Sequence, residues 1–283
     1  MSGPRYIQAE EISSQVAELC GLACCRLPED VLACLSRAEK EEKSPVGRKV
    51  LTMLLENAGL ARRENIPLCQ DCGTAVVWAN LGQEALIRGG DFYQAISRGV
   101  ALGYDKYYLR KSMAHPFSRA NSNDNTPPIV HLSLVPGRSL ALTLAPKGGG
   151  AENVSRLFML APALGREGVV KAVLDTVDQA GANPCPPLVV SLAVGGNMED
   201  AALRAKKNLL LRSLTEPNPD PEAAVLEEEL LAAVNRLGIG PAGLGGSVTC
   251  LRVLADIKAC HIASLPLAVN LQCHAARHQT VVL

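Results

Sequence analysis

The spacing of apolar residues divides the chain into a helical beginning and a longer part with mixed patterns. In residues 1–62, apolar residues recur at helical spacing, as in "AEEISSQVAELCGLACC". "LPEDVLACLSRAEKEE" starts at a proline with acids in its first turn. "SPVGRKVLTMLLENAGLARRE" offers Ser44 as the N-cap, with Pro45 after it. We therefore predict that residues 1–62 are helical.

After residue 69 the pattern becomes one of short apolar runs separated by helical segments. We predict strands in "TAVVWANLG", in "IVHLSLVPGRSLALTLAPKGGG" (two strands joined by the turn "PGR"), in "PPLVVSLAVGG", in "SVTCLRVLADIKAC" and in "SLPLAVNLQC". We predict helices in "DFYQAISRGVALGYDKYYLR", "AENVSRLFMLAPA", "REGVVKAVLDTVDQAGA", "NMEDAALRAKKNLLLR" and "AVLEEELLAAVNRLG". This alternation predicts a mixed α/β fold, with helices flanking one or more mixed sheets. The sequence has no internal repeat or low-complexity linker, and we assign residues 1–283 to a single domain.

Composition and charge narrow the function classes. Aromatic residues are only 3% of the chain against 48% hydrophobic residues, so the core must be built mainly from Ala, Leu and Val. The 28 basic residues balance the 28 acidic ones, and nothing indicates a surface for nucleic acid or membranes. No apolar stretch reaches the roughly 18 residues that span a bilayer. The first residues, "MSGPRYIQAEEISSQVAELC", lack a signal-peptide pattern, so we expect a cytoplasmic protein.

Ten cysteines are many for such a protein. In a reducing compartment a disulfide framework is not expected. We expect the cysteines of the helical region, and Cys250 and Cys260 on alternating apolar runs, to be packed thiols. The cysteines of the helical region are Cys20, Cys24, Cys25 and Cys34. The remaining four stand at strand ends or in loops and are the candidates for chemistry.

The pair in "CQDC", Cys69 and Cys72, allows several interpretations. A thioredoxin-type redox pair usually follows a strand and opens a helix, whereas this pair precedes a strand. A structural zinc site needs four ligands, and the chain has no second C-x-x-C. Cys185 precedes a buried strand and Cys273 follows one. Three scattered thiolates suit an iron–sulfur cluster with one iron left to act as a Lewis acid, although dispersed cysteines are common.

Three other features are candidates for binding an anion or moving a proton. In "APKGGGAEN", consecutive glycines and Lys147 offer backbone N–H groups and a positive charge, although a tight turn explains them equally well. Arg110 has the fork geometry that binds carboxylates, or is simply solvated. His261 is either a catalyst or a structural residue. Asp124 and the asparagines of "NSNDNTPP" are expected to cap or turn their loop.

These motifs together resemble one family. "PLCQDCGTAVV", "LRKS" with "NSNDNTPP", "KGGGAENVSRLFML", "AGANPCPPLVVSLAVGG", "AALRAKKNLLLR", "GIGPAGLGGSVT" and "HIASLPLAVNLQCHAARH" occur in this order. They closely resemble the α-subunit, or N-terminal domain, of class I iron–sulfur fumarate hydratase, in a superfamily that includes L-tartrate dehydratase. The resemblance covers roughly residues 10 to 280.

The resemblance implies a [4Fe-4S] cluster held by Cys69, Cys185 and Cys273, with one open iron that binds the substrate hydroxyl and one carboxylate. It also implies roles for residues around the cluster. Gln70 and Asp71 are expected beside the cluster, and Asp71 is expected to take part in proton transfer. The dicarboxylate is expected to contact Arg110, Lys147, Gly149 and His261. His261 is expected to be a second catalytic residue.

The sequence departs from the family at Cys72, where the usual motif Cys-Gln-Asp-Thr-Gly has threonine. The substitution is silent, or it offers an alternative ligand or an oxidation-sensitive thiol. The resemblance also implies a partner β-subunit, in an α2β2 assembly, because the family's second part supplies further substrate-binding residues.

The expected reaction is the reversible hydration of fumarate to L-malate, since "KGGGAEN" looks more like the fumarase form than the tartrate form. The alternatives are dehydration of L-tartrate to oxaloacetate, and a non-catalytic cluster- or zinc-binding protein.

Overall fold

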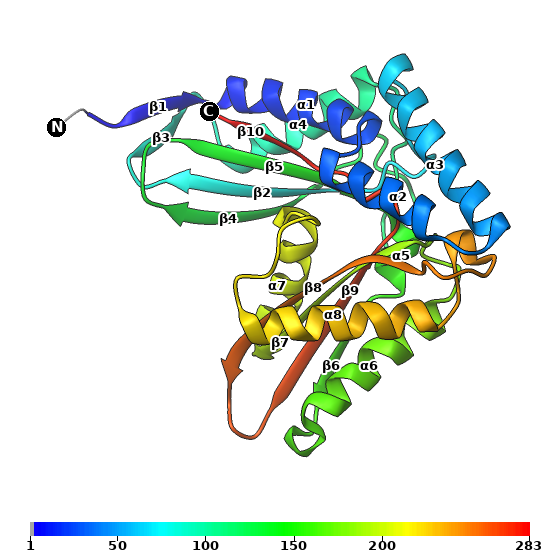
Figure 1. The fold of residues 1–283 in the computed structure, drawn as a ribbon. Coiled ribbons are helices and arrows are strands. Elements are labelled where there is room, and N and C mark those ends of the chain that lie inside the picture. Colours follow the sequence, from blue (N-terminus) through cyan, green and yellow to red (C-terminus); the bar gives the residue numbers. More distant parts are fainter. Residues whose placement is uncertain (1–2) are drawn as a thin grey trace. The chain divides into compact units, whose positions relative to one another are not determined.

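The structure is a computed structural model that describes residues 3–283, and it divides the chain into two compact units (Figure 1). Unit one consists of Met1–Pro28, Ala58–Gly149 and Arg277–Leu283. Unit two consists of Glu29–Asn57 and Gly150–Ala276. The chain therefore crosses between the units four times, at 28/29, 57/58, 149/150 and 276/277. The assignment of residues 1–283 to a single domain stays a prediction.

The helices predicted near the start of the chain are present. They are α1 (Ala9–Cys25), α2 (Glu29–Glu41) and α3 (Pro45–Glu64), preceded by a short strand, β1 (Arg5–Gln8), that was not predicted. Ser44 acts as the predicted N-cap of α3, because its hydroxyl oxygen accepts a hydrogen bond from the N–H of Gly47 at 3.2 Å.

Unit one contains a four-stranded sheet in the order β10-β5-β2-β4. Its strands are β2 (Thr74–Gly82), β4 (Ile129–Val135), β5 (Leu140–Lys147) and β10 (Gln279–Val282). The central strand β2 is parallel to β4 and antiparallel to β5. The two strands joined by the "PGR" turn therefore flank β2 and do not pair with each other. A separate parallel pair joins β1 to β3 (Ala85–Arg88).

Two helices of unit one, α1 and α4 (Phe92–Lys106), pack closely against each other. A Cβ atom at Gly99 would lie 2.6 Å from the carbonyl oxygen of Ser13, and one at Gly103 would lie 2.7 Å from that of Ala17. The two glycines are therefore needed for this close approach. Buried Leu, Val, Ile and Ala side chains from these helices and from the sheet form the core of unit one, as the composition predicted.

Unit two contains a second four-stranded sheet, in the order β6-β9-β7-β8. Its strands are β6 (Arg156–Leu160), β7 (Leu188–Gly196), β8 (Cys250–Cys260) and β9 (Leu265–Gln272). Its helices are α6 (Gly165–Ala180), α7 (Met198–Leu211) and α8 (Pro221–Arg236). Strand β7 is parallel to β8 and antiparallel to β9. The apolar residues that β7 places on one face pack with α6 and α8, and those of the opposite face pack with α7.

The mixed α/β class is confirmed, and two element predictions are wrong. Residues 5–8 lie in the part predicted to be helical, but they form β1 and pair with β3. The segment "SRLFML" was predicted to be helical, but the short helix α5 (Gly149–Asn153) ends before it and residues 156–160 form β6, which pairs with β9. Three four-residue strands, β1, β3 and β10, were not predicted, because runs this short have no measurable period. The described helices include none that is long and apolar enough to cross a membrane.

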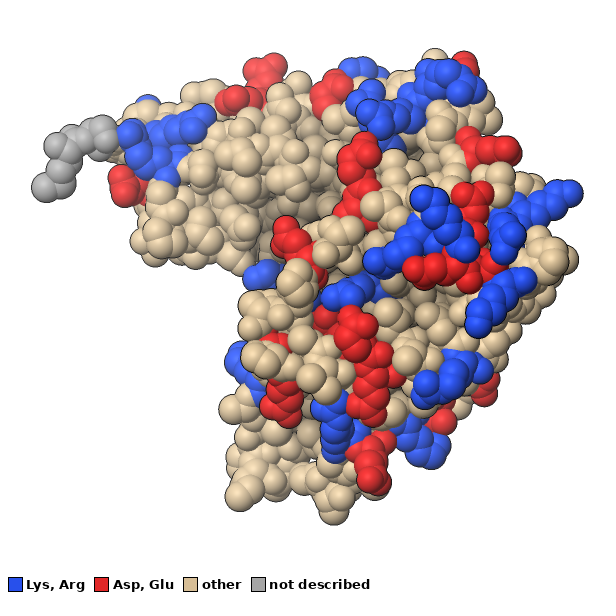
Figure 2. Space-filling view, in the orientation of Figure 1, with Lys and Arg blue, Asp and Glu red and all other residues tan. Residues whose placement is uncertain are grey.

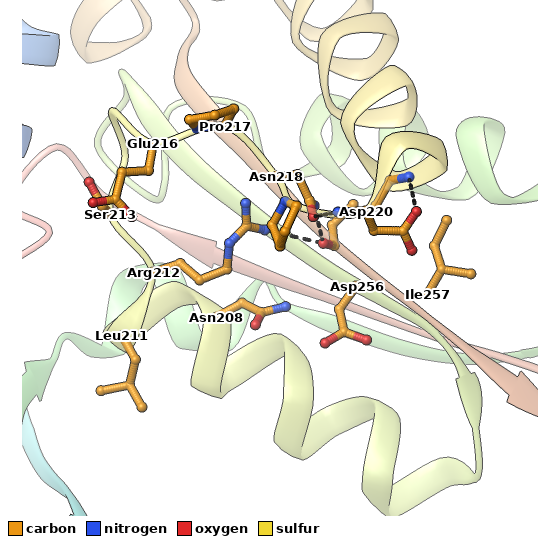
Figure 3. Close-up of a pocket in the computed structure, with 13 residues that line it drawn as sticks. Asn208, Leu211, Arg212, Ser213, Glu216, Pro217, Asn218, Asp220, Asp256 and Ile257 are labelled. Atoms are coloured by element: carbon orange, nitrogen blue, oxygen red, sulfur yellow. Dashed lines mark hydrogen bonds between the residues drawn. The ribbon is translucent and has the colours of Figure 1, made fainter.

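Charged side chains of both signs are interspersed on the face shown in Figure 2, in agreement with the balanced composition. Unit two has a cavity of about 450 Å³ where the loop after α7 crosses β8 (Figure 3). Asn208, Arg212, Asn218 and Asp256 are among the residues that line it.

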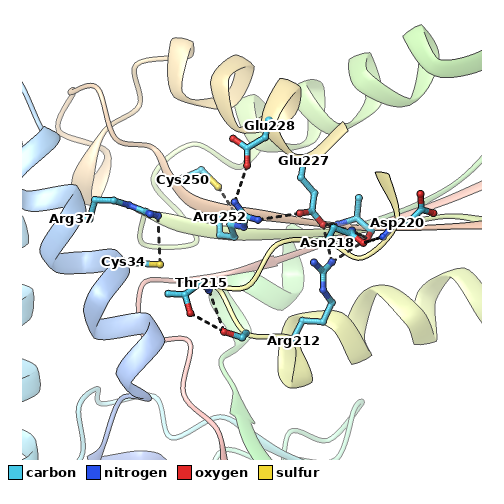
Figure 4. Close-up of polar contacts among 12 residues, drawn as sticks. Cys34, Arg37, Arg212, Thr215, Asn218, Asp220, Glu227, Glu228, Cys250 and Arg252 are labelled. Atoms are coloured by element: carbon cyan, nitrogen blue, oxygen red, sulfur yellow. Dashed lines mark hydrogen bonds and ion pairs between the residues drawn. The ribbon is translucent and has the colours of Figure 1, made fainter. Parts of the chain in front are cut away.

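A buried carboxylate next to this cavity fastens α8 to the sheet (Figure 4). The Glu227 side chain is only 1% exposed. It accepts hydrogen bonds from Arg212 at 2.8 Å, from Asn218 at 2.6 Å and from the N–H of Ala255 at 2.7 Å, and it pairs with Arg252 at 3.4 Å. Every oxygen of this buried charge therefore has a partner, and the arginine of the cavity wall is held in one orientation.

A second buried carboxylate, Glu42, fastens the segment before α3 to the loop before β8. It accepts hydrogen bonds from the N–H groups of Ser44 at 2.7 Å, Ser247 at 2.9 Å and Val248 at 2.8 Å, and from the Ser247 hydroxyl at 3.1 Å. Burial acts to raise the pKa of Glu42, but these hydrogen bonds outweigh it and hold the pKa below its usual value.

We expect unit two to lose stability at acidic pH through Glu42. A carboxylate with a lowered folded-state pKa contributes stability that is complete above the unfolded pKa of about 4.3 and is lost as the pH falls through the folded-state pKa. Glu42→Gln should lower the free energy of unfolding by about 1–3 kcal/mol at pH 7, and by less at about pH 3.5. Urea titrations at both pH values measure this, with the exposed neighbour Glu41→Gln as the control. A difference that does not depend on pH would contradict the assignment.

Candidate active site

The carboxylate of Asp71 is held by backbone groups just before β2. Its Oδ1 accepts a hydrogen bond from the N–H of Gly73 at 2.9 Å, and its Oδ2 accepts one from the N–H of Gly149 at 2.9 Å. Arg277 donates from Nη2 to the carbonyl oxygen of Asp71 at 2.5 Å. Unit one therefore brings the "CQDC" loop and the Gly-rich turn together, and the N–H of Gly149 orients Asp71.

The two cysteines of this loop face different surroundings. Cys69 is half-buried, and its Sγ accepts a hydrogen bond from the N–H of Asp71 at 3.4 Å. Gln70 beside it is exposed, and its Oε1 lies 3.3 Å from Cys69 Sγ. The role of Cys69 as a ligand stays a prediction.

Cys72 is instead 2% exposed and belongs to the core of unit one. A hydrogen bond from the Cys24 thiol lowers the pKa of Cys72 to about 6, although burial acts to raise it. The backbone N–H of Arg110, which lies 3.3 Å from Sγ, and the Arg277 guanidinium also lower this pKa. The core position favours a packed replacement for threonine over a ligand.

Two buried residues that the sequence analysis did not single out form hydrogen bonds to the backbone of this loop. The buried Tyr104 donates its hydroxyl to the carbonyl oxygen of Cys72 at 2.6 Å. Asn125, with 0% exposure, donates from Nδ2 to the carbonyl oxygen of Gly73 at 3.1 Å and accepts from the N–H of Ser112 at 2.6 Å. Asn125 therefore links the segment after Arg110 to the loop of Asp71. The only sequence signal was an asparagine-rich loop, whose residues were expected to form turns.

We expect Asn125→Ala to lower the free energy of unfolding by about 2 kcal/mol more than Asn123→Ala, because it leaves buried backbone groups without partners. Asn123 is the matched control: it lies in the same loop with the same left-handed backbone, φ 66° against 62°, but is exposed. Denaturant titration measures both. Equal losses would show that Asn125 acts only through its backbone conformation.

The other unit-one candidates lie around the start of β2. Lys147 is buried at the end of β5, where it pairs in register with Thr74. Gly73 adopts φ +67°, and a Cβ there would lie 2.7 Å from the carbonyl of Lys147, so only glycine fits. The side chain of Arg110 is exposed just beyond α4. Unit one thus assembles six of the nine predicted site residues: Cys69, Gln70, Asp71, Arg110, Lys147 and Gly149.

Unit two brings Cys185 and Cys273 to the same end of its sheet. Cys185 is exposed, precedes β7 and adopts φ +55°, an unusual conformation for a residue with a side chain. Cys273 follows β9, the antiparallel neighbour of β7. The N–H and the ring Nδ1 of His274 lie 3.4 Å and 3.0 Å from the carbonyl oxygen of Cys185. The segment after Cys273 is therefore in contact with Cys185.

His261 lies at the other end of β9 from Cys273, in the exposed hairpin that follows β8. The eight residues of β9 span about 26 Å, so unit two does not bring His261 to its two candidate cysteines. The catalytic role of His261 stays a prediction. Packing was predicted correctly for Cys250, which is buried, and wrongly for Cys260, which is exposed at the last residue of β8.

The cysteines of the helical region differ from the three candidate ligands in their exposure to solvent. All ten cysteines lie in the described residues and none of them forms a disulfide bond, and the four of the helical region are buried. Among the residues from 3 to 283, no three His, Cys, Asp or Glu side chains of one unit are grouped to hold a metal ion. The three candidate ligands are divided, with Cys69 in unit one and the other two in unit two.

A carboxylate fixed by two backbone N–H groups beside a half-buried thiol suits acid–base chemistry on a small substrate. Comparison with known proteins identifies the enzyme class as that of the hydro-lyases. The model of the fumarate hydratase (Fumerase) family matches residues 13–282, and the chain belongs to this family.

Similar proteins carry names from one branch of this family. The chain is 39% identical over 275 residues to the putative L(+)-tartrate dehydratase subunit alpha of Methanocaldococcus jannaschii, covering 94% of this chain and 95% of that protein. It is 30% identical over 277 residues to the L(+)-tartrate dehydratase subunit alpha of Escherichia coli K12, covering 96% of this chain and 91% of that protein. The resemblance found in the sequence is therefore confirmed, and so is the enzyme class.

Proposed function

We propose that the chain is the α-subunit of an iron–sulfur hydro-lyase that interconverts fumarate and L-malate. The observation that carries this proposal is the carboxylate of Asp71, oriented by the N–H groups of Gly73 and Gly149 next to the thiol of Cys69. The similar proteins are named alpha subunits, which supports a partner subunit. We propose that this partner is a β-subunit that completes the site, in an α2β2 assembly in the cytoplasm.

The cofactor we propose is a [4Fe-4S] cluster with Cys69, Cys185 and Cys273 as its ligands. These thiols fit the group, because each is at least partly exposed and lies in a loop, whereas Cys20 and Cys24 are buried in helix α1. When bound, the cluster would supply an iron without a protein ligand, which acts as a Lewis acid.

The remaining chemistry belongs to side chains of this chain. Asp71 removes or returns the proton on the carbon next to a substrate carboxylate, since its carboxylate is already oriented. Arg110 and Lys147 attract the two carboxylates, and Gln70 contacts the substrate. His261 has no part in this contact within one chain, because unit two holds it at the opposite end of β9 from Cys273. The negative charge that develops on the substrate after proton removal is stabilised by the same cations.

A second candidate reaction, dehydration of L-tartrate, is favoured by the names of the similar proteins. It uses the same residues on a substrate with one more hydroxyl group. The fumarase-like "KGGGAEN" turn is the reason to place fumarate first.

The test is an assay of the chain co-expressed anaerobically with its β-subunit. We expect kcat/KM for fumarate hydration to exceed that for L-tartrate dehydration by at least about tenfold, a preference of roughly 1.4 kcal/mol. The reverse preference would establish the tartrate reaction and overturn the fumarate assignment. Turnover of neither substrate by an iron-loaded complex would overturn both and favour a non-catalytic cluster-binding or zinc-binding protein.

A further inference from the structure

The face of the unit-two sheet that α7 covers changes from small apolar residues to polar ones along the strands. Strands β7 and β9 pair in register on this face in three successive layers: Ala193 with Ala268, Ser191 with Asn270, and Val189 with Gln272. Alternate residues of a strand point to the same side, so Ser191, Asn270 and Gln272 share this face.

Helix α7 runs along these layers. Its Ala201 and Ala205 pack against the alanine layer of the sheet. Asn208 lies three residues further along α7 and on the same side of the helix as Ala205. It therefore reaches the next layer, that of Ser191 and Asn270.

All four polar side chains are more than nine-tenths buried: Ser191 is 0% exposed, Asn208 8%, Asn270 9% and Gln272 4%. Each has one atom without a hydrogen-bond partner among residues 3–283. These atoms are Ser191 Oγ, Asn208 Nδ2, Asn270 Oδ1 and Gln272 Oε1. Buried polar groups are nearly always satisfied in folded proteins, so this group indicates a bound polar molecule.

The chemistry of the four atoms selects the ligand. Asn208 offers an N–H donor, Asn270 and Gln272 offer carbonyl acceptors, and Ser191 offers a hydroxyl that can do either. A metal cation would meet the N–H of Asn208, and an anion would meet the two carbonyl oxygens. Water both donates and accepts, and it commonly bridges such groups inside proteins.

The four side chains, together called the polar row, lie between a cavity at one end and the candidate cluster ligand Cys273 at the other. Asn208 also lines the cavity of about 450 Å³ shown in Figure 3. Gln272 donates from Nε2 to the carbonyl oxygen of Ala275 at 3.2 Å and lies 3.8 Å from Cys273 Sγ. The row therefore extends from this cavity to the side of Cys273.

We propose that Asn208, Ser191, Asn270 and Gln272 bind internal water molecules that lead from this cavity to Cys273 and supply the water consumed in hydration. Each hydration adds one water molecule across the double bond, with its proton going to one carbon and its hydroxyl to the other. The binding of water stands on unit two alone, whereas its use in the reaction rests on the proposed function.

The direct test is a high-resolution crystal structure of the full-length protein. We expect ordered water hydrogen-bonded to at least two of the four side chains. A monovalent cation in their place, or direct bonds among the side chains with no water, would overturn the proposal. This outcome does not depend on the substrate, so it stays decisive if the hydro-lyase assay fails.

The change in Tm caused by Ser191→Ala gives a second test, because the two explanations predict different signs for this change. If Ser191 binds water shared with its neighbours, its loss should lower Tm by about 2–4 °C. If its oxygen is merely unpaired, Tm should stay the same or rise, and the water site would be overturned. The control is Thr176→Val, which removes another buried hydroxyl of unit two, one already bonded to the carbonyl oxygen of Ala172 at 2.7 Å.

The link to catalysis is tested with the same pair of variants. In the iron-loaded complex, Ser191→Ala should lower kcat for hydration by about tenfold with KM and iron content unchanged, whereas Thr176→Val should keep the parent kcat. Equal kcat values for both variants would show that the internal water plays no part in the reaction. A loss of iron in Ser191→Ala would reassign the row to positioning Cys273.

Discussion

Replacing Cys69, Cys185 or Cys273 by serine should each remove most of the cluster iron that anaerobic reconstitution gives, which is about four atoms per parent chain. Hydro-lyase turnover should fall by about 10³-fold or more, because the Lewis acid is worth several kcal/mol of transition-state stabilisation. The reason is structural: each of these thiols is at least partly exposed in a loop. Iron and sulfide analysis of the purified variants measures the first effect.

Two other cysteines provide matched controls for this experiment. Cys72→Ser changes the same loop but a buried thiol, and Cys260→Ser changes an exposed thiol of unit two. Both should keep about four irons per chain. Tight zinc in place of iron, or a cluster that survives the loss of Cys185 and Cys273 but requires Cys72, would contradict the three-cysteine assignment.

Asp71→Asn should reduce kcat by about 10²- to 10⁴-fold while the iron content stays at the parent level. The substitution keeps the shape of the side chain but removes the base. One amide oxygen can still accept the N–H of Gly73 or of Gly149, whereas the amide nitrogen cannot accept the other. Steady-state kinetics with fumarate and with L-malate measures the effect.

The control for this variant is Asp124→Asn. Asp124 accepts hydrogen bonds from the N–H and hydroxyl of Thr126, in a loop that unit one places near the site, and it contacts no candidate residue. It should keep kcat within about twofold of the parent, as expected of a substitution outside the catalytic machinery. An unchanged kcat in Asp71→Asn would remove Asp71 from the mechanism, and loss of iron together with kcat would assign it to cluster binding instead.

The hydrophobic pattern predicted the longer elements, because helices such as α7 and strands such as β2 carry a period along their whole length. It failed at β6, where "RLFML" has an apolar run that suits either state and only pairing with β9 decides. It also could not show that β4 and β5 lie on opposite sides of β2, since pairing partners depend on contacts between distant segments.

The candidate site was identified differently. Residue types and a family resemblance selected Cys69, Asp71 and Arg110 without any geometry. Tyr104 and Asn125 could not be found in this way, because neither type suggests chemistry and their importance comes from backbone groups more than ten residues away. The division into two units was also hidden, since the chain crosses between them without a flexible linker.

The interleaving of the two units has a consequence for the order in which the protein is made. Strand β5 is synthesised well before its neighbour β10, and the larger segment of unit two, Gly150–Ala276, lies between them. The sheet of unit one therefore needs residues that follow this segment. On the ribosome, unit one must therefore remain incomplete, with the edge of β5 open, until unit two has emerged.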